Sequence, residues 1–207
     1  FGKGAAGALV SQPVDGPHVL VPDVTEALTA LAKASRARMQ GKVLGVTGSV
    51  GKTGTKEALS AALERRHRGK VHRSLKSYNN HTGGMNHAGE IRALTALVRP
   101  HVALITAIAP AHIENLGSME AIADAKSEIY ESLEPEGTAI LPNDTPYRDR
   151  ILRAARRYAE HIVTFGSGDA DVTALHAVRA DNGGSLVTAR LRESELTYNI
   201  AQPGEHW

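Results

Sequence analysis

The sequence contains no cysteine, which excludes a disulfide framework and a thiolate metal site and fits a reducing compartment. It shows no signal peptide and no apolar run long enough to cross a bilayer, so we expect a cytoplasmic protein that does not enter a membrane. Neither sign of charge dominates, because 24 Lys and Arg residues stand against 22 Asp and Glu residues. A formal net charge of +2 does not indicate a basic face for nucleic acid.

The 207 residues, 42% of them hydrophobic, are enough for one large domain or a domain and a half with a buried core. Residues 1–40 are typical of the edge of a preceding α/β unit, with a helix that carries Leu28, Leu31 and Ala32 on one side. Because the chain opens abruptly at Phe1, we expect an N-terminal domain to be mostly absent from it.

From residue 41 onward, short apolar strands alternate with helical patterns. The predicted strands cover residues 42–47, 70–73, 102–106, 138–142 and 161–166. The predicted helices cover residues 52–66 and begin near residues 90, 118 and 145. This alternation predicts an α/β fold with a mostly parallel sheet flanked by helices. Period-two segments at 171–180 and 185–192 then predict an antiparallel hairpin toward the C-terminus, extended by residues 196–200.

The stretch VLGVTGSVGKTGTKEAL, residues 43–59, runs from an apolar strand through glycines and a lysine into a helix. Glycines let backbone N–H groups turn toward an anion, and the helix adds its positive N-terminus. Lys52 can reach the β and γ phosphates of a nucleotide, and the Thr53 hydroxyl can bind Mg²⁺. The order of these features predicts a P-loop, although Val46 stands where the strict motif has its first glycine. The alternative is a glycine-rich turn that merely joins a strand to a helix.

The sixteen residues SLKSYNNHTGGMNHAG, 74–89, have no period and are too long for a structureless loop in a compact domain. We therefore expect that a strand is missing at Gly83-Gly84. The same loop carries polar side chains at predicted strand ends, where an open α/β sheet binds its ligand. These are Asn79, Asn80, His81, Asn86 and His87. Taken singly, each fits a turn residue as well as a binding residue.

Five ordered segments resemble the Mur ligases of peptidoglycan synthesis, and the resemblance covers nearly the whole chain. They are GVTGSVGKTGTKE, NNHTG, NHAGEI, AHIENLGSMEAIADAKSEIYESL and LPNDTP. The first is similar to the ATP loop of the family, whose T-G-x-x-G-K-[ST] form accounts for the displaced glycine. The others are most similar to the family member that joins D-Ala-D-Ala to UDP-MurNAc-tripeptide.

The resemblance implies an ATP-dependent amide ligase that needs Mg²⁺ and works as a monomer. The peptide carboxylate of the UDP-sugar would take the γ-phosphoryl group, and the amine of D-Ala-D-Ala would attack the resulting acyl phosphate. It also implies that residues 1–40 belong to an N-terminal UDP-substrate domain and linker. Residues 41–207 would form the central ATP-binding domain, and the family's C-terminal domain would be absent.

Site residues follow from the same resemblance. The triphosphate would lie against Thr47, Gly48, Ser49, Val50, Gly51, Lys52 and Thr53, and the adenine beside Asn143. The metal ligands would be Thr53, His112 and Lys126, and the catalytic residues Lys52, His112 and Lys126. The UDP-sugar peptide would face Asn79, Asn80, Asn86 and His87.

Lys126 lies at the margin of a helical stripe formed by Ile122, Ala125, Ile129 and Leu133. On its own, this position predicts an aliphatic stem on the core and an ammonium in water. The resemblance implies instead that the amine takes up CO₂ to become a carbamate, whose oxygens can bind Mg²⁺.

Two departures from the family pattern leave other functions open. A metal-binding glutamate expected just ahead of NHAGE is absent, and the chain ends at PGEHW, where the family continues. One alternative is another Mur-type or folylpolyglutamate-type ligase, against which the paired asparagines of YNNHTG argue. The other is a P-loop module that binds a nucleotide without catalysis.

Overall fold

The computed structural model describes residues 1–74, 87–110, 116–179, 181 and 183–200. Internal contacts divide the chain into two compact units, Phe1–Gly41 and Lys42–Trp207. Among the described residues, none of the helices combines the length and the apolar character needed to span a membrane.

The first unit contains a pair of short parallel strands and one helix. Strand β1 (Ala8–Val10) pairs with β2 (His18–Leu20), and helix α1 covers Val24–Arg38. Asp23 caps this helix by accepting the backbone N–H of Glu26 at 2.8 Å. The predicted apolar side is exposed within this unit, since Leu28 and Leu31 retain 55% and 57% of their accessible surface.

The second unit is built on a seven-stranded sheet with the order β3-β4-β5-β6-β7-β8-β9. The parallel strands are β3 (Leu44–Thr47), β4 (Val102–Ile105), β5 (Thr138–Pro142) and β6 (His161–Phe165). Strand β7 (Val172–Arg179) joins β6 in parallel, and β8 (Ser185–Leu191) and β9 (Ser194–Ile200) continue antiparallel. The predicted mostly parallel sheet with an antiparallel hairpin is confirmed.

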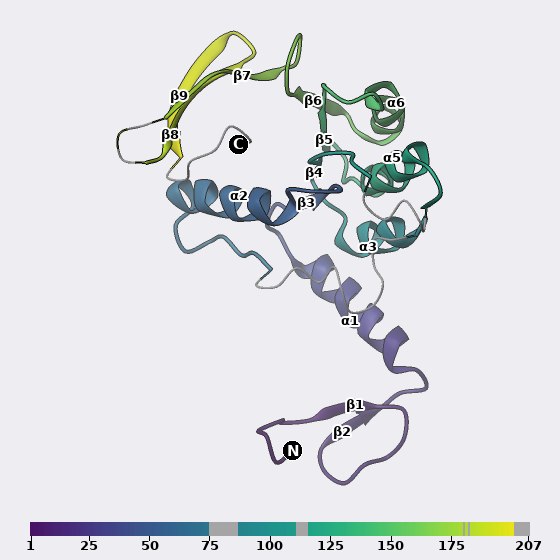
Figure 1. Cartoon of the computed structure of the whole chain (residues 1–207). Coiled ribbons are helices and arrows are strands. Elements are labelled where there is room, and N and C mark those ends of the chain that lie inside the picture. Colours follow the sequence, from purple (N-terminus) through teal and green to yellow (C-terminus); the bar gives the residue numbers. More distant parts are fainter. Residues whose placement is uncertain (75–86, 111–115, 180, 182, 201–207) are drawn as a thin grey trace. The chain divides into compact units, whose positions relative to one another are not determined.

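Helices flank the parallel strands on both sides, with α3, α5 and α6 together on one side and α2 on the other (Figure 1). Their bounds are Lys52–Arg66 for α2, Glu90–Val98 for α3, Met119–Ser127 for α5 and Arg148–Tyr158 for α6. A short 3₁₀ helix, η1 (Glu128–Tyr130), continues α5. The core lies between the sheet and α3, α5 and α6, where Ile105, Tyr130 and Leu141 are fully buried.

Two predicted elements differ from the structure. Residues 70–73 form no strand among the described residues, because Val71 is the only apolar side chain in KVHR and supplies no face to bury. This segment instead follows α2, where Lys56 Nζ donates to the carbonyl of Ser74 at 2.8 Å. Helix α6 begins at Arg148 and not at Thr145, because the N–H of Arg148 closes a turn on the carbonyl of Thr145 at 3.1 Å.

Candidate functional site

The loop between β3 and α2 has a backbone that only glycine accommodates easily at two positions. Gly48 has φ +144° and Gly51 has φ +83°, and Gly51 is the N-cap of α2. A Cβ atom at Gly48 would overlap with Thr106 Oγ1. Gly51 has no side chain with which to cap α2, and the backbone N–H groups at a helix N-terminus attract anions. The loop therefore has the backbone features of a phosphate cradle.

Strand β4 holds this loop in place. Thr47 pairs with Ile105, so the residues that follow, Gly48 and Thr106, lie side by side. The N–H of Thr106 donates to the carbonyl of Thr47 at 2.9 Å, and its hydroxyl bridges the carbonyls of Thr47 and Val50. The loop is thus preorganised by contacts within the protein.

Ser49 makes a second set of contacts to the segment after β4. Its N–H donates to the carbonyl of Ala107 at 2.9 Å, its hydroxyl donates to the carbonyl of Ala109 at 2.9 Å, and the same hydroxyl accepts the N–H of Ala109 at 3.0 Å. The Ser49 hydroxyl therefore holds the loop against the backbone of Ala109. Its predicted contact with the triphosphate stays a prediction. Thr106 was not among the predicted site residues, although a polar residue at the end of the adjacent strand was an available signal.

Lys52 and Thr53 occupy the first turn of α2. The half-buried Lys52 donates from Nζ to the carbonyl of Gly48 at 2.6 Å, and burial lowers the pKa of its ammonium. Thr53 is exposed on the same turn. An ammonium, a hydroxyl and a helix N-terminus are the donor set that a triphosphate with Mg²⁺ requires, so these residues fit both.

Lys126 on α5 is buried, with 2% of its surface exposed. The prediction of an ammonium in water is therefore wrong, although Ile122, Ala125 and Ile129 form the buried stripe as predicted. Burial lowers the pKa of Lys126, and the positive charge of Lys52 lowers it further, whereas nearby carboxylates oppose the shift. The charge of one predicted catalytic residue thus acts on another, and burial shifts Lys126 toward its neutral amine.

His87 lies three residues before Glu90, the first residue of α3, and contacts it. Glu90 accepts the N–H of His87 through Oε2 and contacts Nδ1 through Oε1, both at 3.2 Å. The charge of Glu90 also acts on Lys126 and raises its pKa. This places the described part of the NHAGE motif near the buried lysine.

Asn143 follows the last residue of β5, and its side chain makes hydrogen bonds to other residues of the protein. Its Nδ2 donates to the carbonyl of Ser167 at 2.8 Å and to Asp169 Oδ1 at 3.3 Å, while its Oδ1 accepts from Arg148 Nε at 2.6 Å. These contacts join the β6–β7 connection to α6. A place beside the adenine stays a prediction.

Several predicted site residues lie outside the described residues. They are Asn79, Asn80, Asn86 and His112, and the expected junction at Gly83-Gly84 lies there too. Within the described ranges, His, Asp and Glu side chains form no group of three or more that could hold a metal ion. A metal site built from the described residues alone would draw on other groups, such as the Thr53 hydroxyl and a modified Lys126.

Comparison with known proteins agrees with this geometry. Residues 83–207 match the family model described as the Mur ligase middle domain. The chain belongs to the Mur ligase family. It is 34% identical to the UDP-N-acetylmuramoyl-tripeptide–D-alanyl-D-alanine ligase of Bacillus subtilis (strain 168) over 230 residues, which cover 100% of this chain and 48% of that protein. The chain thus spans about half the length of the curated Mur ligase relatives that match its whole length.

Solved Mur ligase structures have the same fold. A crystal structure of MurF from Acinetobacter baumannii superimposes with a TM-score of 0.78 at 32% identity, covering 96% of this chain and 47% of that one. MurF ligase from Thermotoga maritima in complex with ADP gives a TM-score of 0.76 at 24% identity, covering 97% of this chain and 50% of that one. The second likeness shows the fold alone.

Proposed function

We propose that the protein is the Mur ligase that joins D-Ala-D-Ala to UDP-MurNAc-tripeptide in peptidoglycan synthesis, at the expense of ATP. The observation that carries the proposal is the β4-supported phosphate loop, whose Lys52 acts electrostatically on the buried Lys126. The name of the Bacillus subtilis relative supports the choice of substrates.

In this reaction the tripeptide carboxylate attacks the γ-phosphorus of ATP, and ADP leaves. The amine of D-Ala-D-Ala then attacks the acyl carbon, the C–N bond forms, inorganic phosphate leaves with the C–O electrons, and the amine loses a proton. The first step crowds a carboxylate against a triphosphate, and only cations and aligned donors can offset that repulsion. The Lys52 ammonium and the N-terminus of α2, which follows Gly51, are the donors that would meet the phosphates.

Bound Mg²⁺ would neutralise part of the negative charge, with Thr53, His112 and Lys126 as its protein ligands. Lys126 can serve only after its neutral amine has attacked CO₂ and lost a proton to become a carbamate, because an ammonium offers no lone pair and Mg²⁺ prefers oxygen ligands to an amine. Its burial and the lowered pKa favour that neutral amine. The fit therefore depends on the modification of one lysine.

The remaining parts of the proposal concern organisation. Residues 1–40 belong to a UDP-substrate domain and linker, and residues 41–207 form the ATP-binding domain. Asn79, Asn80, Asn86 and His87 face the UDP-sugar peptide, and Asn143 faces the adenine. The protein works as a cytoplasmic monomer.

Release of inorganic phosphate tests the function directly. With the protein encoded by the whole gene, ATP and UDP-MurNAc-tripeptide, phosphate release should depend on D-Ala-D-Ala and should match amide formation. ATP binding without any phosphate release would instead identify a non-catalytic nucleotide-binding module. Release that depends on a folate and glutamate would identify a folylpolyglutamate-type ligase.

A further inference from the structure

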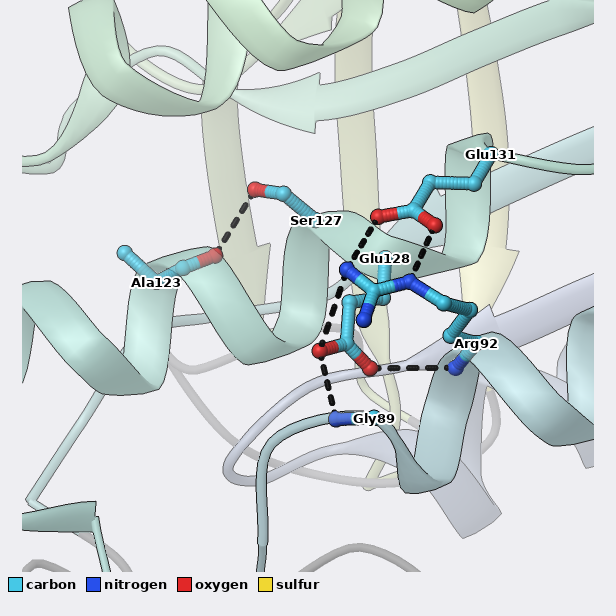
Figure 2. Close-up of polar contacts among 6 residues, drawn as sticks. All are labelled: Gly89, Arg92, Ala123, Ser127, Glu128 and Glu131. Atoms are coloured by element: carbon cyan, nitrogen blue, oxygen red, sulfur yellow. Dashed lines mark hydrogen bonds and ion pairs between the residues drawn. The ribbon is translucent and has the colours of Figure 1, made fainter.

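The N-terminus of α3 is capped by a residue from another element. Its N-cap is Gly89, which has φ +89° and no side chain to accept a backbone N–H. Glu128, 39 residues later in η1, supplies the acceptors instead (Figure 2). One carboxylate oxygen accepts the N–H of Gly89 at 2.7 Å, and the other accepts the N–H of Arg92 at 3.0 Å. The two oxygens of Glu128 thus hold the main chain at both ends of the first turn of α3.

The burial of Glu128 strengthens its hydrogen bonds to the main chain of α3. Glu128 is only 5% exposed, and hydrogen bonds from backbone N–H groups to a buried carboxylate at a helix N-terminus are charge-assisted. Arg92 Nη2 also lies 3.8 Å from Glu128 Oε1, but the guanidinium makes its bidentate hydrogen bonds with the carboxylate of Glu131. Glu128 therefore holds the main chain of α3, whereas Glu131 holds one exposed side chain of the same helix.

Both ends of the Glu128 contact lie next to proposed site residues. Glu128 follows Lys126 by two positions, and Gly89 follows His87 by two positions. Between them, Glu90 contacts His87 and acts electrostatically on Lys126. A shift of the start of α3 relative to α5 and η1 would therefore change the distance between His87 and Lys126.

We propose that Glu128 is a positioning residue, which fixes the His87–Glu90 segment relative to Lys126 so that the UDP-sugar peptide meets both at once. This inference rests on the proposed function, in which His87 faces that substrate. Glu128 itself need not touch a reactant. It acts through the main chain of Gly89 and Arg92.

The test is Glu128→Gln, made in the protein encoded by the whole gene. A carboxamide has one acceptor oxygen, so only one of the two N–H groups keeps its partner, and the other meets an NH₂ donor. We expect the KM for UDP-MurNAc-tripeptide to rise about tenfold, while the KM for ATP stays within about twofold. Hydrogen exchange at the amides of Gly89 and Arg92 should become faster.

Glu131→Gln is the matched control, because it removes the same charge three residues further on without releasing the main chain of α3. Both KM values should stay within about twofold of the unmodified protein. If Glu128→Gln does not fold, Glu128→Asp replaces it, since a shorter side chain pulls both oxygens back and should produce the same split between the KM values.

An equal rise in both KM values, or a lower melting temperature with unchanged kinetics, would overturn the positioning role. Failure of the proposed function gives a different result, because the unmodified protein would then form no amide at all. In that case calorimetric binding of UDP-MurNAc-tripeptide still decides about Glu128. An unchanged dissociation constant in Glu128→Gln would reject the positioning role, and a tenfold weaker one would support it.

Discussion

At the scale of single residues, the proposed site is a cluster of charge that folding alone would not favour. A lysine that is 2% exposed and sits within the field of a second lysine is costly for the folded state. Residues with such shifted pKa values concentrate at functional sites. The energetic cost of Lys126 is therefore an argument for its use, and it can be measured apart from activity.

Replacement of Lys52 tests the phosphate loop. Lys52→Ala removes the only side-chain ammonium on the first turn of α2, so turnover of ATP should fall at least about 100-fold. The circular dichroism spectrum should stay unchanged, because the side chain is only half buried. Lys56→Ala, one turn further along α2, is the control and should keep near-normal turnover. Normal turnover in Lys52→Ala would refute the role of the loop.

The cost of burying Lys126 predicts a pH dependence of stability. The folded-state pKa is lowered, so between it and the ordinary value of 10.5 the unfolded chain binds more protons, and stability rises with pH. Below the folded-state pKa the full penalty is present. Lys126→Met should therefore be more stable than the unmodified protein at neutral pH, and the difference should shrink as pH approaches 10.5. Denaturant unfolding in CO₂-free buffer measures this, with Lys33→Met at an exposed position of α1 as the control for the loss of one positive charge.

The carbamate proposed at Lys126 predicts chemical rescue. Lys126→Ala should lose ligase activity because Mg²⁺ loses its oxygen ligands at this position. A small carboxylate such as acetate should restore part of the activity by replacing those oxygens, whereas chloride at the same ionic strength should restore none. Equal effects of the two anions would show that Lys126 does not act through oxygen ligands.

At the scale of elements, the phosphate loop depends on the strand beside it. The hydroxyl of Thr106 bridges two carbonyls of the loop, and the loop backbone at Gly48 comes so close that no Cβ would fit. Thr106→Val keeps the shape of the side chain and removes both contacts. We expect a loss of about 1 kcal/mol in the free energy of unfolding and weaker ATP binding. Thr197→Val, in the β8–β9 hairpin, should leave ATP binding unchanged in the same titration.

The sequence predicted elements well where local chemistry decides them. The bounds of α2 were predicted at Lys52 and Arg66, because a glycine-rich loop marks its start and an unbroken helical pattern follows. The strand expected at residues 70–73 failed, because one valine among charged residues does not define a face. The start of α6 was three residues early, since Thr145 and Pro146 fit a turn as well as a helix cap.

The residues of the candidate site also divide into those that local sequence identifies and those that depend on distant segments of the chain. The loop from Thr47 to Thr53 could be identified from its own spacing, because its chemistry is local. Glu128 could not, because it acts on a segment more than 30 residues away in the sequence, and the signal for Thr106 was its place at the end of the adjacent strand. The burial of Lys126 was also missed, since helical periodicity locates a buried stripe but not which other elements cover its margin.

At the scale of the whole molecule, the contacts of the phosphate loop with Thr106, Ala107 and Ala109 lie within Lys42–Trp207, and the same unit contains Lys126 and Glu128. The start of this unit has its own anchor, because the N–H of Val43 donates to His101 Nδ1 at 3.0 Å and the carbonyl of Val43 accepts the N–H of His101 at 2.8 Å. The unit therefore carries its own means of ordering β3, which leads directly into the loop.

Removal of residues 1–41 tests this independence. A chain that starts at Lys42 keeps Val43 and its two bonds to His101, so β3 should still pair with β4 and present the loop. We expect ATP affinity, measured by calorimetry, to stay within about twofold of that of residues 1–207, because separate domains keep their own cores. A chain that starts at Leu44 loses the Val43 anchor, and we expect it to bind ATP more weakly. A loss of more than tenfold on removal of residues 1–41 alone would show that the first unit contributes to the nucleotide site.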